Sequence, residues 1–248
     1  MKLNQMSKVL FYSLFAIALY SCSEEEKEVK EIVEVVLPAG YDQFTEDVRV
    51  TIDGEFMVIS SLGVPNHKSP YWEAESPLNT AYDGNNSNFY LNGNTITEFD
   101  MIFRIPLNPA KASEHKTTPE GPIGVALNGV AFFNQYSSGT AGLSVEINTF
   151  DQYQGHPNQE GMYHYHIEPL YLTTNGRSKL LGYLLDGFPV YGPTENGSTI
   201  LESDLDEFHG HEGTTPEYPD GIYHYHITKF APYINGAGFY GTSGTVTF

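Results

Sequence analysis

The sequence has one cysteine, Cys22, among 248 residues, and it has few basic residues. A chain with a single cysteine cannot form an intramolecular disulfide. There are 12 Lys and Arg against 31 Asp and Glu, a formal net charge of −19. Because nucleic-acid binding needs clustered Lys and Arg to neutralise phosphates, nucleic acid is excluded as a partner.

The apolar run at residues 9–21, VLFYSLFAIALYS, is short for a membrane span and follows two lysines. It ends at Cys22 and resembles a bacterial lipoprotein signal, with Leu19 at −3 and Ser21 at −1. We therefore expect a signal peptide over residues 1–21 and a membrane anchor through lipid attached to Cys22. An ordinary secretory signal with an incidental cysteine is the alternative.

An acidic stretch, CSEEEKEVKE, follows immediately. It predicts a solvated tether over residues 22–43. Serine and a glutamate run directly after the cysteine resemble the export signal of bacterial surface lipoproteins. We expect an outer-membrane location with a lipid anchor, facing the cell surface; a plain charged spacer is the alternative.

The rest of the chain lacks helical periodicity. It contains 24 Gly, 15 Pro and 18 Tyr, and short strand-like runs separated by turn residues. In VRVTIDGEFMVISS (48–61), apolar and polar residues alternate around Asp53-Gly54, which is typical of a β-hairpin. The pattern predicts an all-β fold, a single sandwich-like or barrel-like domain over residues 44–248.

The C-terminal two-thirds contains an internal duplication, with copies at about 123–170 and 181–230. Each copy has an apolar strand, a turn at Asn128-Gly129 or Asp186-Gly187, a G-H segment and a YHYH strand. Such a repeat suggests two similar substructures related by a pseudo-two-fold axis. A site at their interface would draw ligands from both copies.

The YHYH strands carry the most distinctive chemistry. Side chains at i and i+2 of a strand share a face, so the two histidines of each motif project together and the tyrosines lie opposite. Each copy has a further histidine in the preceding G-H segment. The candidate metal ligands are His156, His164, His166, His211, His224 and His226.

Three imidazole nitrogens per copy suffice for an open transition-metal site, with copper or zinc favoured and iron a further candidate. Six nitrogens are too many for one tetrahedral ion. Either two ions bind, or some of the histidines do not bind the metal and instead orient the histidines that do. The alternative is that the histidines are buried in ordinary hydrogen-bond networks with tyrosines.

Four further residues form a second tier. His209 creates an additional H-x-H with His211 but has no counterpart in the first copy, and His67 lies in a Pro-containing loop. Asp151 and Asp206 are equivalent in the two copies. They are expected either to bind the metal or an imidazole, or to cap a turn.

Several motifs together resemble the YHYH family: SSLGVPNHKSPYW, GPIGVALNGVAFFNQY, GHPNQEGMYHYH, LLGYLLDGFPVYGP and GIYHYHIT. The resemblance runs from about Ser60 to near the C-terminus and implies one duplicated domain, secreted or membrane-anchored. It adds His67 to the six motif histidines. Many members carry cysteines near the G-H segments, where this chain has Tyr153 and Phe208, so a disulfide there is lost.

Three functional hypotheses follow. The first is an outer-membrane lipoprotein that holds a transition metal for supply, buffering or redox. The second is a metal-dependent enzyme or accessory protein with a polysaccharide ligand, on which the tyrosines would stack. The third is a structural or interaction protein. No nucleophile elbow, phosphate loop or HExxH helix is present, so the sequence leaves enzymatic activity open.

Overall fold

The computed structural model describes residues 36–137 and 141–248. The expected signal peptide, Cys22 and most of the expected tether lie outside these residues. One compact unit runs from Leu37 to Phe248. Tyr41, inside the range expected as tether, is buried, and its ring stacks 4.2 Å from that of Tyr183. Ordered packing therefore begins before residue 44.

A four-stranded antiparallel sheet forms one side of this unit, with the strand order β1-β2-β3-β14. The hairpin predicted at Asp53-Gly54 is confirmed, because Asp53 pairs with Phe56 across the turn. Burial alternates along β2, which places Met57 and Ile59 in the core. The strands are β1 (Arg49–Asp53), β2 (Phe56–Ser61), β3 (Met101–Pro106) and β14 (Thr245–Thr247).

An eight-stranded sheet carries the duplicated sequence, in the order β12-β13-β9-β8-β4-β5-β7-β6. Its strands are β4 (Pro122–Ala126), β5 (Ala131–Phe133), β6 (Gly155–Pro157), β7 (Tyr163–Tyr165), β8 (Leu180–Leu184), β9 (Pro189–Tyr191), β12 (Gly210–Gly213) and β13 (Ile222–His226). A short hairpin, β10 (Thr194–Glu195) with β11 (Ser198–Thr199), follows β9. The helical turns are η1 (Tyr41–Gln43), η2 (Glu146–Thr149), η3 (Glu202–Asp204) and α1 (Leu170–Thr173).

The two copies meet at the centre of this sheet, where β4 pairs antiparallel with β8. Val125 faces Tyr183, and these two residues occupy the same position in the two copies. On either side of this pair, Gly124 faces Leu184 and Ala126 faces Gly182. Gly124 corresponds to Gly182 and Ala126 to Leu184 in the two copies, so the two pairings are equivalent. This register is the signature of a local two-fold relation and confirms the predicted pseudo-symmetry.

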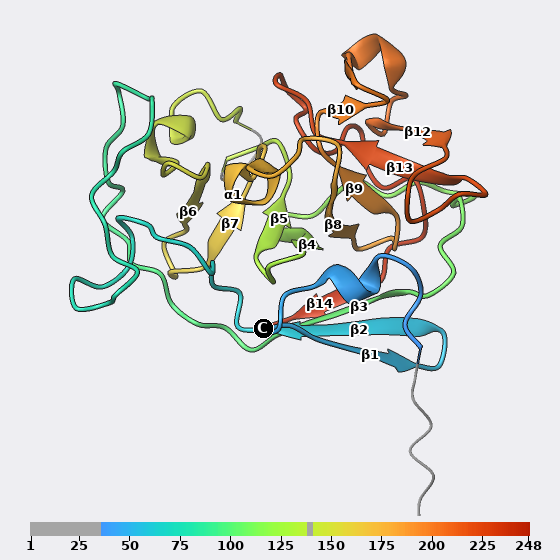
Figure 1. The fold of residues 1–248 in the computed structure, drawn as a ribbon, viewed down its shortest axis with the longest axis horizontal. Coiled ribbons are helices and arrows are strands. Elements are labelled where there is room, and N and C mark those ends of the chain that lie inside the picture. Colours follow the sequence, from blue (N-terminus) through green and yellow to red (C-terminus); the bar gives the residue numbers. More distant parts are fainter. Residues whose placement is uncertain (1–35, 138–140) are drawn as a thin grey trace, which may run out of the picture. The chain divides into compact units, whose positions relative to one another are not determined.

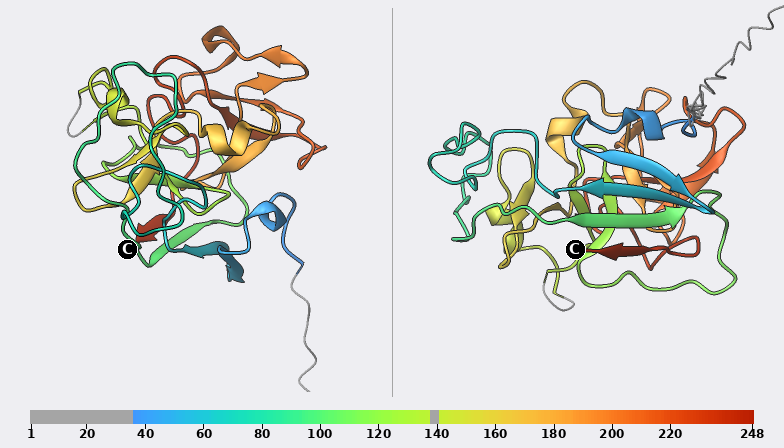
Figure 2. Two further views of the ribbon diagram at one scale, coloured as in Figure 1. Left: turned by 60° about the vertical axis from the view of Figure 1, so that its left-hand side comes forward. Right: turned by 90° about the horizontal axis from the view of Figure 1, so that it is seen from below.

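The hairpin turns of both copies rest against the smaller sheet (Figures 1 and 2). Gly129, at the β4–β5 turn, has φ of +81° and accepts a hydrogen bond of 2.7 Å from Ser61 Oγ at the end of β2. Gly187, at the β8–β9 turn, has φ of +84° and lies against the backbone of Pro106 at the end of β3. Positive φ is accessible to glycine without strain, so both turns close tightly.

The all-β, sandwich-like prediction is confirmed, and within the described residues the sheets do not close into a barrel. Strands β4 and β8 are buried along their whole length, as expected of strands covered on both faces. Across the residues with described structure, no helix has the length and apolar character to cross a membrane.

Candidate metal centres

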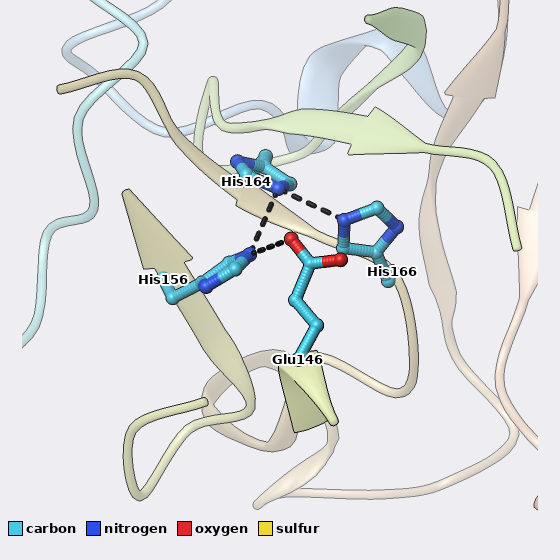
Figure 3. Close-up of side chains that lie close together, drawn as sticks. All are labelled: Glu146, His156, His164 and His166. Carbon is cyan, nitrogen blue, oxygen red and sulfur yellow. Dashed lines mark hydrogen bonds and ion pairs between the residues drawn. The ribbon is translucent and has the colours of Figure 1, made fainter. Parts of the chain in front are cut away.

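One cluster of potential ligands lies at the β6–β7 end of the large sheet. Three histidine nitrogens and a carboxylate oxygen all fall within 4.8 Å of one another. His156 on β6 is paired in register with His164 on β7, and the third histidine follows β7 on the same face. Figure 3 shows all four side chains directed toward one point. We call this cluster site 1; its members are Glu146, His156, His164 and His166.

The ligand atoms of site 1 have the spacing of a coordination shell. His164 Nε2 lies 3.1 Å from His156 Nε2 and 2.9 Å from His166 Nε2. A Glu146 oxygen lies 3.2 Å from His156 Nε2. In tetrahedral zinc sites with bonds of about 2.0–2.1 Å, neighbouring ligand atoms are roughly 3.4 Å apart. A small outward movement therefore makes room for an ion.

The second copy forms an equivalent cluster at the other end of the sheet. His211 on β12 is paired in register with His224 on β13, and their Nε2 atoms are 3.1 Å apart. A Glu195 carboxylate lies 3.4 Å from His224 Nε2 and 3.6 Å from His211 Nε2. We call this cluster site 2; its members are Glu195, His211, His224 and His226.

Backbone carbonyls fix the tautomer of the strand histidines in the same way in both copies. The Nδ1–H of His164 donates to Met162 O (2.9 Å), and that of His224 donates to Ile222 O (3.0 Å). A carbonyl can only accept, so Nδ1 carries the proton and a neutral ring has its lone pair at Nε2. The Nδ1–H groups of His166 and His226 likewise donate to carbonyls, those of Asn134 and Gly192.

The tautomer of His156 is fixed by a hydroxyl. Thr149 Oγ1 donates its only proton to the carbonyl of Glu146 (2.7 Å) and therefore accepts from His156 Nδ1–H (2.7 Å). The lone pair of a neutral His156 is again at Nε2, inside the cluster. All three histidines of site 1 thus present Nε2 to a common point, as metal-ligating histidines do.

Burial keeps the strand histidines neutral. It holds the pKa of His164 well below its usual value, with His156 and His166 adding to the effect, and it lowers the pKa of His166 to about 4. In site 2, burial lowers the pKa of His226 to about 4 and also lowers that of His224. At neutral pH these rings therefore offer lone pairs rather than positive charges.

Two facing lone pairs cannot form a hydrogen bond. A proton shared between His156 and Glu146 would satisfy that pair, but the Nε2 atoms of His164 and His166 remain opposed at 2.9 Å. Glu146 Oε2 and His226 Nε2 are buried and have no hydrogen-bond partner among the described residues. Buried polar atoms are normally paired, so this arrangement disfavours an ordinary tyrosine–histidine network and favours a bound cation.

Neither carboxylate is among the ligands that the sequence predicts. Glu146 begins η2, whereas Glu195 lies on the β10–β11 hairpin, so the two copies supply this side chain from different segments. Burial alone would raise the pKa of Glu146, but its hydrogen bond to His156 and its electrostatic interactions with the neighbouring imidazoles lower it overall. The sequence signal is weak: the segment between the second and third strands holds one glutamate in the first copy but three in the second.

A cavity of about 1130 Å³ opens onto site 1, and all four members of the site line it. Among the described residues, its wall includes three glutamates and no lysine or arginine. Exposed aromatic side chains, Tyr90, Tyr136 and Phe248, also line it. Of the site 2 members, His211 lines a second hollow of about 430 Å³.

The second-tier histidines do not join either cluster. His67 lies on the opposite face of β7, where its Nε2 is 3.1 Å from the hydroxyl of Tyr165. His209 has a left-handed backbone (φ of +74°), the conformation of Gln154 at the equivalent turn of the first copy, and its Nε2 is 3.0 Å from Thr228 Oγ1.

Asp151 and Asp206 also lie outside both clusters and cap equivalent turns. Each accepts a backbone N–H bond from the residue two positions on, 2.8 Å for Asp151 and 2.9 Å for Asp206. Each also accepts from the first tyrosine of its YHYH motif: Tyr163 to Asp151 (2.9 Å) and Tyr223 to Asp206 (2.8 Å). Burial raises the pKa of Asp151 to about 6. Of the alternatives, the geometry fits the turn cap.

The duplicated sequence that carries the YHYH strands corresponds to a known family. The sequence matches the family described as YHYH protein over residues 102–200 and 194–238. The chain belongs to the YHYH family. Comparison with curated proteins and with solved structures gave no match. In this YHYH protein, the six histidines do not meet in one site between the copies, because each copy builds its own cluster, as the two-ion alternative requires. Strands β7 and β13 are five strand-to-strand steps apart, roughly 24 Å.

Proposed function

We propose that this YHYH protein binds two transition-metal ions, one in each cluster, through three imidazole nitrogens and one carboxylate. The observation that carries the proposal is the pair of buried Nε2 lone pairs on His164 and His166, which face each other at 2.9 Å. The different origins of Glu146 and Glu195 support it further. Both glutamates lie in the connection between the second and third strands of their copy, but at different places, Glu146 in η2 and Glu195 in β10, and both still reach the histidines.

Copper or zinc suits this set of ligands best. Imidazole favours zinc, copper, iron and nickel, and a carboxylate is a common partner for divalent ions. Neither cluster includes a sulfur ligand, which argues for Cu(II) over Cu(I). With four protein ligands, a tetrahedral zinc would be closed, whereas a five-coordinate ion would keep a position for water.

Metal analysis of protein produced without a histidine tag tests the proposal. After reconstitution with Zn²⁺ or Cu²⁺ and removal of free metal, we expect close to two equivalents per chain. Less than about a tenth of an equivalent of either ion, in a protein whose circular dichroism shows a folded β structure, would refute metal binding.

The cavity at site 1 favours a second candidate function, metal-dependent chemistry on a polysaccharide. An ion at site 1 lies against a space somewhat larger than common ligand pockets, which measure about 300–1,000 Å³. The exposed rings of Tyr90 and Tyr136 offer apolar faces for sugars. The glutamates in its wall, with no Lys or Arg among the described lining residues, disfavour anionic substrates. A bound ion would supply an activated water or a polarising charge.

The test is a screen of neutral and uronate oligosaccharides, with and without a chelator. Product release from at least one neutral substrate that stops on metal removal, and in Glu146→Gln, supports the enzyme. Activity that survives in metal-free protein would place the chemistry elsewhere. No product from any substrate, with two equivalents of metal bound, would leave binding as the function.

We also propose that the domain is anchored to the outer membrane by lipid on Cys22, facing the cell surface. The sequence motif around Cys22 and the acidic run behind it support this placement. In a Gram-negative expression host, labelled palmitate should be incorporated into the wild-type chain and not into Cys22→Ala. Equal labelling of both, or labelling of neither, would contradict the anchor.

A further inference from the structure

The two clusters share their ligand types but differ in how firmly the protein holds the ligands. We propose that site 1 retains its ion, whereas site 2 exchanges its ion with the surrounding solution. This inference rests on the proposed metal binding and adds a division of labour between the copies. It predicts one resident ion beside the large cavity and one labile ion.

Every histidine of site 1 is held in place by a hydrogen bond at Nδ1, the ring nitrogen that does not face the cluster. The Nδ1–H of His164 and that of His166 donate to carbonyls, and His156 Nδ1–H donates to Thr149 Oγ1. All three imidazoles are at most 3% exposed. Their orientation and tautomer are therefore set before any ion arrives, so little conformational entropy is lost on binding.

Thr149 forms hydrogen bonds with two ligand residues of site 1, Glu146 and His156. It is the last residue of η2, the turn that begins with Glu146, and its hydroxyl bridges the Glu146 carbonyl and the His156 ring. It touches neither proposed ion, so we assign it as a positioning residue. In the second copy, Asp204 occupies the equivalent place, two residues before the turn-capping aspartate, and accepts a bond from the backbone N–H of Leu201 instead.

Site 2 lacks this support at one ligand. His211 Nδ1 makes no hydrogen bond to any described residue, and the side chain is 26% exposed. Its ring can rotate toward solvent, and either nitrogen can carry the proton. The carboxylates do not distinguish the sites, because the side chain of Glu195 is 22% exposed and that of Glu146 is 26% exposed. His211 is therefore free to move away from the other three ligands of site 2, which opens a route for the ion to leave.

The expected size of the difference comes from known metal sites. Removing a group that orients a ligating histidine typically weakens metal binding about 10- to 100-fold. Site 2 has no such group at His211, so we expect its affinity to be lower than that of site 1 by about the same factor. Association rates at the two sites should differ less, so most of the gap should appear in the rate of release.

Zinc release to a large excess of the chromogenic chelator 4-(2-pyridylazo)resorcinol tests this. Protein loaded with two equivalents of Zn²⁺ should release one equivalent rapidly and the other at least tenfold more slowly. His211→Ala, a change at a partly exposed residue, should remove the fast phase and leave the slow phase. Thr149→Val should accelerate the slow phase by tenfold or more, whereas Thr149→Ser, which keeps the hydroxyl, should leave it unchanged.

The possible failures are distinguishable. A wild-type chain that binds neither zinc nor copper refutes metal binding itself. Two equivalents released in one phase, or a slow phase that disappears in His211→Ala, would overturn the division of labour while leaving metal binding intact. Equal acceleration by Thr149→Val and Thr149→Ser would show that the hydroxyl has no positioning role, and would also overturn the proposed basis of retention.

Discussion

The Nε2 atoms of His156 and His164 lie 3.1 Å apart across a directly paired position of β6 and β7. Their counterparts in the second copy, His211 and His224, are separated by the same distance. Direct pairing on antiparallel strands places two side chains on one face within contact distance. The strands therefore bring together two ligands in each copy, and the third follows from the i, i+2 repeat.

Replacing one strand histidine should remove one ion and only one. His164→Ala deletes a ligand whose Nε2 contacts both other imidazoles of site 1, so the metal content should fall from two equivalents to one. His67→Ala is the matched control, because His67 is as buried but lies on the opposite face of β7. It should keep two equivalents. Loss of both ions in His164→Ala would contradict independent sites.

The carboxylates should matter for their charge. Glu146→Gln keeps the size of the side chain but supplies a neutral amide. Zinc affinity at site 1 should therefore fall about 10- to 100-fold, which is the typical loss when a group that orients a ligating histidine is removed. Glu195→Gln should do the same at site 2. Competition with a calibrated chelator measures both. Glu212→Gln, next to His211 but outside the cluster, is the control and should leave both affinities unchanged.

Metal should stabilise the fold. An ion that binds only the native state stabilises it by about 2.7 kcal/mol when free metal is 100 times its Kd. For a domain of this size, that corresponds to roughly 5–10 °C in Tm per site. Thermal unfolding with and without a chelator measures the shift. Glu146→Gln should lose part of it, and an unchanged Tm on metal removal from wild type would argue against binding to the native state.

The turn-capping aspartates should affect stability without affecting metal content. Asp151→Ala leaves the hydroxyls of Tyr163 and Ser69 without their acceptor, which should cost about 3 kcal/mol in the free energy of unfolding. Urea unfolding of metal-free protein measures the cost, and Glu160→Ala, at an exposed loop residue, should change it by about 0.5 kcal/mol or less. Metal analysis of folded Asp151→Ala should still give two equivalents; one equivalent would assign Asp151 a direct role.

Local sequence patterns were sufficient to predict much of this architecture. The Asp53-Gly54 turn predicts the first hairpin because its chemistry is local. The alternation of Tyr and His in residues 163–166 fixes which side chains share a face, because strand geometry has a period of two. The duplication predicts the pseudo-two-fold relation, which the Val125–Tyr183 pair confirms.

Other features depend on contacts between distant segments. Glu146 and Glu195 occupy different positions in the two copies, so no repeat comparison identifies them as equivalent. Asp151, although equivalent to Asp206, faces Tyr163 rather than the histidines, and the sequence does not distinguish these two environments. The same holds for His67, whose Nε2 faces the hydroxyl of Tyr165.

The sequence by itself therefore determined the fold class, the duplicated unit and the six histidines, because each follows from periodicity or turn chemistry along the chain. Only the tertiary structure decided that these histidines form two clusters rather than one. The reason is the pairing of β4 with β8, which places the YHYH strands of the two copies on opposite sides of the sheet centre. It also decided which glutamate completes each cluster, because chain folding alone brings η2 and the β10–β11 hairpin to the histidines.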